Sequence, residues 1–117
     1  TKVYSLARWI NREREIIPES TITTPPSAEL RPDQLDQDSL PPYDVLDSIL
    51  EAYVVEGRDA EAIIASGHDE ATVERIIRLI NLNEYKRRQS PVGVRLTERG
   101  FGRDRRYPIT NAWPIGD

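Results

Sequence analysis

The sequence predicts a mainly α-helical segment with long loops, and three observations support this prediction. Apolar side chains recur every three or four residues in three separate stretches. Six of the nine prolines gather between residues 18 and 42. Four of the six glycines come at residue 93 or later. The chain has 117 residues, 38% of them hydrophobic, so we expect one small domain rather than two.

The first stretch, residues 2–13, predicts a short amphipathic helix. Its apolar face consists of Val3, Leu6, Ala7 and Ile10, and polar or charged residues fill the other side. The chain starts within this pattern, without a methionine and without a capping residue. We therefore expect the sequence to be a piece of a longer protein.

Residues 16–42 break this periodicity and predict a long loop, in which prolines alternate with Ser, Thr, Asp and Gln. Loops of this length are uncommon inside compact domains, where they are functional lids or linkers. The pattern alone leaves both interpretations open. Within the loop, TTPPSAEL at residues 23–30 offers hydroxyls, a rigid Pro-Pro pair and a carboxylate, although such residues occur in many turns.

Three further helices are predicted after this loop. The first covers residues 43–56, where Pro42 suits the first turn and Gly57 suits the end. Its apolar positions are Tyr43, Leu46, Ile49, Leu50 and Tyr53. A short helix follows at residues 60–65, and a longer one, beginning near Asp69, covers residues 72–86. The apolar positions of the longer helix are Val73, Ile76, Ile77 and Ile80, and Pro91 is expected to stop it.

Charge is distributed unevenly along the chain. Residues 84–107 hold eight basic and three acidic side chains, a net of +5, whereas residues 1–83 hold eight basic and sixteen acidic ones, a net of −8. Cations at residues 86–88 complement the dipole at the end of a helix. The excess continues beyond the helix and consists mostly of Arg, which suits bidentate contact with carboxylate or phosphate. An anionic partner explains more of these cations than the helix dipole does. The candidates for this partner are a nucleotide, a nucleic acid or the acidic half of this protein.

The sequence shows no complete catalytic or metal-binding set. Cysteine is absent, and His68 is the single histidine and is given no role. No Ser-His-Asp combination and no Gly-rich phosphate loop is present. No apolar run approaches the roughly 20 residues of a membrane helix. We therefore predict no catalytic residue, no metal ligand and no membrane contact from the pattern.

Three segments carry a more specific signal: LARWINR…IPESTITTPPSAELRPDQLDQDSLPPYDVLDSILEAY, DEATVERIIRLINLNEYKRRQSP and ERGFGRDRRYPIT. In this order they closely resemble the C-terminal part of NAD synthetases, especially the glutamine-dependent form. The resemblance covers nearly the whole chain. It implies that residues 1–117 are the C-terminal portion of a synthetase domain, with residues 16–42 a mobile active-site loop and residues 91–117 an extended basic tail.

The family resemblance implies a doubly wound α/β fold of the adenine nucleotide alpha hydrolase-like kind. This chain would supply its mobile loop and closing helices, without the pyrophosphate loop and the central strands. The implied enzyme is a ligase that uses ATP and Mg²⁺ to adenylate the nicotinate carboxylate of deamido-NAD. Ammonia, free or released from glutamine, then displaces AMP to form NAD. We expect these residues alone to be inactive.

The same resemblance implies the site residues. Ser27 stands where the family has a hydroxyl residue that contacts ATP, in a P-[ST]-A-[DE]-L loop that Glu29 completes. Lys86 matches the lysine of a His-Lys pair that contacts deamido-NAD in smaller relatives, whereas Tyr85 replaces the histidine. Arg87 follows this pair and is assigned to the same contact.

The expected partners are the nucleotide substrates, the upstream part of the synthetase domain and an N-terminal glutaminase domain. We expect a cytoplasmic homo-oligomer. Two other classes of function remain as alternatives. In one, the Arg and Lys residues of the tail contact nucleic-acid phosphates while interleaved aromatic residues stack on bases. In the other, the amphipathic helices at residues 43–56 and 72–86 form a protein interaction module.

Overall fold

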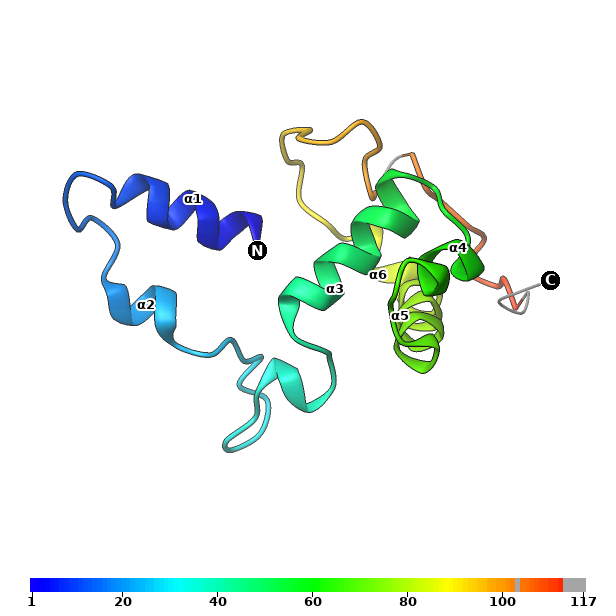
Figure 1. The fold of residues 1–117 in the computed structure, drawn as a ribbon, viewed down its shortest axis with the longest axis horizontal. Helices are drawn as coiled ribbons and strands as arrows, with labels where there is room; N and C mark the ends of the chain where they lie inside the picture. The colour runs from blue at the N-terminus through cyan, green and yellow to red at the C-terminus, as the bar shows by residue number, and fades with distance from the viewer. Residues whose placement is uncertain (103, 113–117) are drawn as a thin grey trace. The chain divides into compact units, whose positions relative to one another are not determined.

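The computed structural model of the chain describes residues 1–102 and 104–112. These residues form helices joined by loops, with no β-strand among them (Figure 1). The prediction of a mainly helical segment is therefore confirmed. The chain divides into two compact units, Thr1–Val45 and Leu46–Asp117, and the division falls inside a helix. None of the helices in the described ranges combines the length and the apolar character needed to cross a membrane.

The first unit begins with α1 (Lys2–Ile10), which confirms the first predicted helix. A second helix, α2 (Glu19–Thr23), and a 3₁₀-helix, η1 (Asp36–Asp38), lie in the segment that was predicted to be an irregular loop. In α2 the hydroxyl of Thr23 donates to the Glu19 carbonyl at 3.0 Å, and Ile22 is buried. A helix of five residues is too short to show periodicity, so the sequence pattern missed it.

The second unit contains most of the core. Its helices are α3 (Tyr43–Leu50, whose first turn belongs to the first unit), the π-helix η2 (Glu51–Val55), α4 (Ala60–Ala65), α5 (Glu70–Leu82) and α6 (Glu84–Arg87). The helices α4 and α5 pack against each other, and α4 also contacts η2 (Figure 1). The largest fully buried side chains come from three of these helices: Ile49, Ile63, Val73, Ile76 and Ile77. Four of these five occupy positions that helical periodicity had marked as apolar, and the exception is Ile63 of the short helix.

Local polar contacts set the boundaries of these helices. The side chains of Asp59 and Asp69 accept hydrogen bonds from backbone N–H groups at the starts of α4 and α5, at 2.7 and 2.9 Å. Asp69 was expected at this position, and the contact confirms it. Gly57, which was expected to end the helix before it, has φ +73°, a left-handed conformation that glycine adopts without steric cost. Its carboxyl-terminal neighbour Arg58 donates its backbone N–H to the Ala52 carbonyl at 3.0 Å.

The last predicted helix is wrong in one respect, its continuity. It is interrupted at Asn83, which separates α5 from α6. The Asn83 side-chain amide donates to the Leu79 carbonyl at 2.8 Å, so it competes for a backbone acceptor. The helix ends at Arg87, within one residue of the predicted end and before Pro91, so the predicted C-terminal end is confirmed.

The described residues of the tail after α6 form no helix, and two contacts with aromatic rings join this part of the tail to the helices of its unit. The guanidinium of Arg105 lies 4.0 Å from the ring centroid of Tyr53 in η2. The ring of Phe101 lies 4.6 Å from the guanidinium of Arg87 in α6. Contacts of this kind between cations and aromatic faces stabilise close packing without an apolar core.

Candidate functional site

The predicted ATP residues lie together in a closed loop of the first unit. The backbone N–H of Asp36 donates to the Pro26 carbonyl at 3.0 Å, which brings the ends of the loop together. Inside it, the hydroxyl oxygen of Ser27 accepts a hydrogen bond from the backbone N–H of Glu29 at 3.0 Å. Ser27 and Glu29 therefore belong to one turn, as their shared motif requires.

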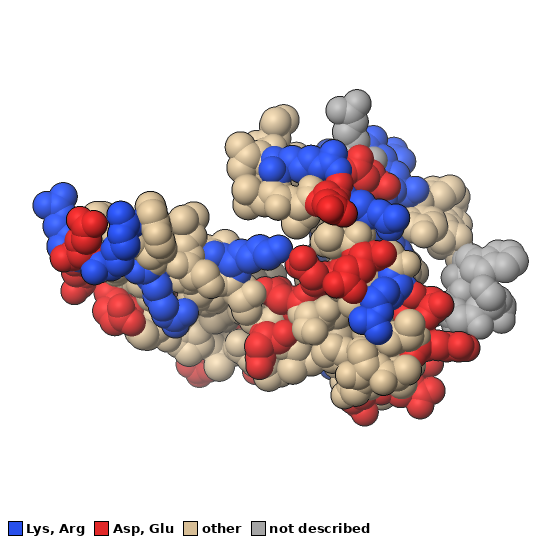
Figure 2. Space-filling view, turned by 45° about the horizontal axis from the view of Figure 1, so that its top comes forward, with Lys and Arg blue, Asp and Glu red and all other residues tan. Residues whose placement is uncertain are grey.

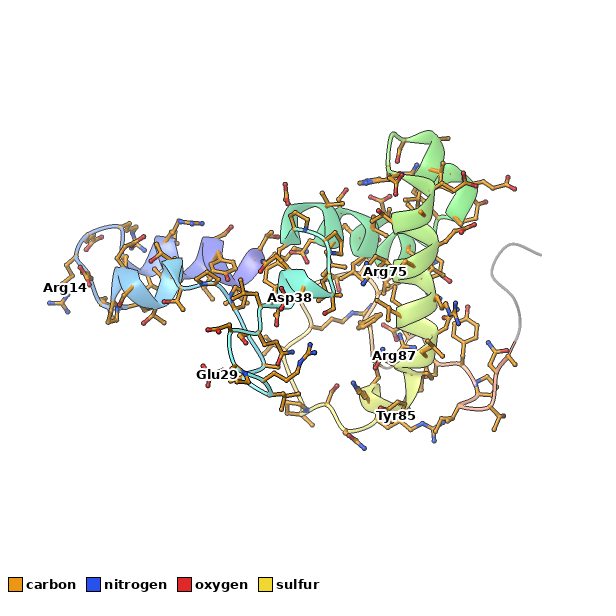
Figure 3. All side chains as sticks on the ribbon, turned by 90° about the horizontal axis from the view of Figure 1, so that it is seen from below. Arg14, Glu29, Asp38, Arg75, Tyr85 and Arg87 are labelled. Atoms are coloured by element: carbon orange, nitrogen blue, oxygen red, sulfur yellow. The ribbon has the colours of Figure 1, made fainter. Side chains whose placement is uncertain are left out.

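The backbone of Glu29 is in the left-handed region, with φ 54°. A residue with a side chain occupies this region at a cost of roughly 1–3 kcal/mol, and such residues concentrate at functional sites. The carboxylate of Glu29 is exposed at the loop (Figure 3). The strain therefore holds an acidic side chain outward instead of burying it.

The loop is attached to the helices of its own unit. Tyr43, at the start of α3, donates its hydroxyl to the Asp36 carboxylate at 2.5 Å. The ring of Tyr43 also contacts the ring of Tyr4 in α1, with 6.5 Å between the ring centroids. One end of the loop is thus fixed by a charge-assisted hydrogen bond. Sequence periodicity does not predict this contact, because Asp36 and Tyr43 lie on different elements.

The predicted deamido-NAD residues lie on α6 in the second unit, where they differ in exposure (Figure 3). Tyr85 is 47% exposed, and Lys86 is exposed with its ammonium 5.9 Å from the Tyr85 ring centroid. The side chain of Arg87, in contrast, is only 8% exposed. The structure therefore presents two of these three side chains to solvent.

Arg87 forms a buried ion pair with Glu84 on the same helix. Glu84 is the one buried charged residue among the described residues, at 3% exposure. Burial, and secondarily the like charge of Arg105, lower the pKa of Arg87 from its ordinary value. The nearby rings of Tyr53 and Phe101 complete its surroundings. The pair lies within α6, and the contact of Arg87 with the Phe101 ring links this helix to the tail while Tyr85 and Lys86 stay exposed.

The two sets of predicted residues belong to different units, so each set is described within its own unit. Figure 2 shows Lys and Arg side chains, in blue, grouped with a few Asp and Glu side chains, in red, in the part of the second unit that carries the tail. No three side chains of the metal-binding types His, Cys, Asp and Glu lie together in the ranges that the structure describes. These residues by themselves do not fit a Mg²⁺ site.

Comparison with known proteins identifies the family. The model of the NAD synthase family matches residues 1–90. The chain belongs to the NAD synthase family. It is 56% identical over its whole length to the glutamine-dependent NAD(+) synthetase of Acinetobacter baylyi and 52% identical over 95% of its length to that of Thermotoga maritima. It spans only 22% and 20% of these relatives.

A solved structure of this family is also similar. It is the glutamine-dependent NAD+ synthetase of Acinetobacter baumannii in complex with adenosine diphosphate. The likeness covers 98% of this chain and 20% of that chain, with 46% identity and a TM-score of 0.64. The NAD synthase segment described here is therefore about a fifth of a larger enzyme in each of these relatives.

Proposed function

We propose that the complete enzyme to which this chain belongs forms NAD from deamido-NAD. ATP transfers its adenylyl group to the nicotinate carboxylate with release of pyrophosphate, and ammonia then attacks the activated carbonyl and displaces AMP. The identity of more than half of the residues to two proteins named glutamine-dependent NAD(+) synthetase carries this proposal. The adenosine diphosphate in the similar structure supports the use of an adenine nucleotide.

In this proposal the turn at Ser27 and Glu29 contacts ATP. The hydroxyl oxygen of Ser27 already accepts the Glu29 N–H, and its own proton remains available to donate. A phosphate oxygen is a suitable acceptor for that proton. The Glu29 carboxylate is repelled by phosphate, so it is better suited to a hydroxyl or amino donor of the nucleoside.

Tyr85 and Lys86 contact deamido-NAD in the same proposal, because both are exposed on α6. The Lys86 ammonium suits a phosphate or carboxylate oxygen of this substrate. Contact of Arg87 with deamido-NAD stays a prediction. Its contact with the Phe101 ring supports a positioning role for this residue, since it links the helix that carries Lys86 to the tail.

The remaining family properties belong to the proposal as well. They are the doubly wound α/β fold of the complete synthetase domain, use of Mg²⁺ with ATP, an N-terminal glutaminase domain, a homo-oligomeric state and a cytoplasmic location. The nucleic-acid alternative loses two of its cations, because Arg87 of α6 and Arg105 of the tail stack on aromatic rings of their own unit. No described contact favours a separate interaction module.

Turnover by the complete enzyme tests this function. With ATP, deamido-NAD and glutamine, chromatography should show NAD and AMP formed in equal amounts. Replacing Ser27 by Ala should weaken ATP binding about ten- to a hundredfold, because a hydrogen bond to a charged group contributes roughly 1.5–3 kcal/mol. Ser20→Ala, on α2 of the same unit, is the matched control. Absence of NAD from the wild-type reaction would contradict the proposed function.

Amide exchange tests the role of the loop. Residues 16–42 should exchange more slowly when a non-hydrolysable ATP analogue is bound, since a functional lid becomes ordered on its ligand. The measurement compares peptides from this segment with peptides from α5, which should not change. Equal exchange of the loop with and without the analogue would refute the role of a lid.

A further inference from the structure

The second unit contains a hollow that none of the predicted site residues lines. Its volume is about 440 Å³, within the range of small-molecule sites. It lies between the tail and the region where η2 ends. Four of the residues that line it are arginines, against one carboxylate: Arg58, Arg99, Arg105 and Arg106, with Asp104.

The single carboxylate is already engaged. Asp104 forms an ion pair with Arg95 at 3.3 Å and accepts a hydrogen bond from the backbone N–H of Gly100 at 2.7 Å. In the described ranges, Arg99, Arg105 and Arg106 have no carboxylate within ion-pair distance. Converging like charges without a counter-charge repel one another. An anion in the hollow would remove this repulsion.

Aromatic rings fix one of these cations in place. The guanidinium of Arg105 lies 4.0 Å from the ring centroid of Tyr53 and 5.1 Å from that of Tyr107. Its Nε is buried and has no hydrogen-bond partner. A buried donor that lacks an acceptor is costly, so native structures seldom leave one unpaired. The rings hold the charge while its hydrogen bonding remains incomplete.

Two further arginines, Arg106 and Arg99, can offer their terminal nitrogens to a ligand in the hollow. Arg106 uses its Nε in a hydrogen bond to the Gly102 carbonyl at 3.1 Å, and its terminal nitrogens make no described contact. Arg99 lies directly over Gly57, where a Cβ atom would stand 2.3 Å from its Nη1. Glycine at this position therefore gives the guanidinium room against bare backbone.

We propose that this hollow binds a phosphate-bearing anion, separately from the ATP and deamido-NAD contacts of the proposed function. Guanidinium groups match phosphate oxygens in bidentate geometry, and four of them converge here. Arg58 contributes least, because it already pairs with Glu56 at 3.8 Å and donates to the Ala62 carbonyl. Arg99, Arg105 and Arg106 form the binding set.

Calorimetry with inorganic pyrophosphate tests the proposal on the complete enzyme. Saturating deamido-NAD and a non-hydrolysable ATP analogue fill both substrate sites, so that only additional binding is measured. We expect one pyrophosphate per chain. The double variant Arg99→Gln/Arg106→Gln should weaken its binding about tenfold or more, as loss of charge-assisted hydrogen bonds does. Both side chains are exposed, so the double variant should fold.

Arg78→Gln is the matched control, because Arg78 is exposed on α5 and does not line the hollow. If Arg78→Gln weakened pyrophosphate binding equally, the loss would come from the lower net charge of the enzyme, and the proposed site would be overturned. Absence of pyrophosphate binding by the wild-type enzyme would also overturn it. If phenylglyoxal then modifies neither Arg99 nor Arg106, an acidic surface of the larger enzyme covers the hollow instead. NAD formation is assayed separately, so failure of the anion site and failure of the proposed function are distinguishable.

Discussion

Replacing Glu84 by Ala should destabilise α6 strongly. The side chains of Glu84 and Arg87 are 4% and 8% exposed, so the substitution leaves a buried guanidinium without its counter-charge. Removing one partner of a buried pair costs about 3–5 kcal/mol. Since about 1.4 kcal/mol corresponds to a tenfold change in an equilibrium constant, local opening should become at least about a hundredfold more frequent.

Native-state hydrogen exchange measures this effect directly. In the complete enzyme, peptides from residues 70–87 should lose about a hundredfold or more of their protection in Glu84→Ala, if opening and closing are faster than exchange. Glu74→Ala is the matched control, because Glu74 is exposed on α5. It removes the same side chain and the same charge without leaving a buried cation.

A second variant separates the ion pair from other effects of the substitution. The double variant Glu84→Leu/Arg87→Met replaces both charges with apolar groups, and such replacements are often neutral or stabilising. It should recover most of the lost protection. If peptides from residues 70–87 are equally protected in Glu84→Ala and Glu74→Ala, the buried pair does not stabilise α6. The positioning role proposed for Arg87 then fails as well.

Three further changes test the remaining assignments. Lys86→Ala should weaken deamido-NAD binding by the complete enzyme about ten- to a hundredfold at an unchanged melting temperature; a helix-dipole role predicts the opposite, a loss of about 0.3–1 kcal/mol of stability at unchanged affinity. Gly57→Ala should lower the melting temperature, because a residue with a side chain adopts φ +73° at a cost of about 1–2 kcal/mol. An unchanged melting temperature would refute this. Hydrogen bonds from the Thr72 side chain and backbone lower the pKa of Asp69. The stabilisation by this cap is therefore present above the ordinary pKa of aspartate and is lost as the pH falls through the lowered value. Asp69→Asn should lack that pH dependence in thermal melts, and identical profiles would contradict it.

The sequence predicted those elements in which local periodicity and core packing agree. The isoleucines and valine of α3 and α5 repeat every three or four residues, and Ile49, Val73, Ile76 and Ile77 are indeed fully buried. The short α4 was predicted with its observed bounds, Ala60–Ala65, because the Ser-Gly-His-Asp sequence that follows it is typical of a break between helices. In these segments the chain neighbours of a residue already contain the information that decides its conformation.

The break at Asn83 could not be predicted in the same way. An asparagine within a helix is ordinary, and the hydrogen bond from its side chain to the Leu79 carbonyl becomes visible only in three dimensions. The apolar face of α1 illustrates a different limit. Val3 and Leu6 are 79% and 57% exposed, so the periodicity identified a helix whose apolar side is not covered within its own unit.

The candidate site shows why residue type alone does not assign a role. Tyr85, Lys86 and Arg87 are consecutive, and the family resemblance placed all three at deamido-NAD. A short helix, however, directs consecutive side chains to different sides. Glu84 precedes Arg87 by one helical turn, and this spacing permits the ion pair that the tail covers through Phe101. The spacing was visible in the sequence, whereas the covering ring came from a distant part of the chain.

The cations of the tail differ in what surrounds them. Arg95 is paired with Asp104, and Arg105 is held between tyrosine rings, so both contribute to docking the tail. A cation that only docks the tail needs a ring or a carboxylate of the same unit as its partner. Arg99 and Arg106 have neither kind of partner among the described residues, yet they line the same hollow. An excess of unpaired arginines around one hollow is therefore better explained by an anion bound there than by the stability of the tail.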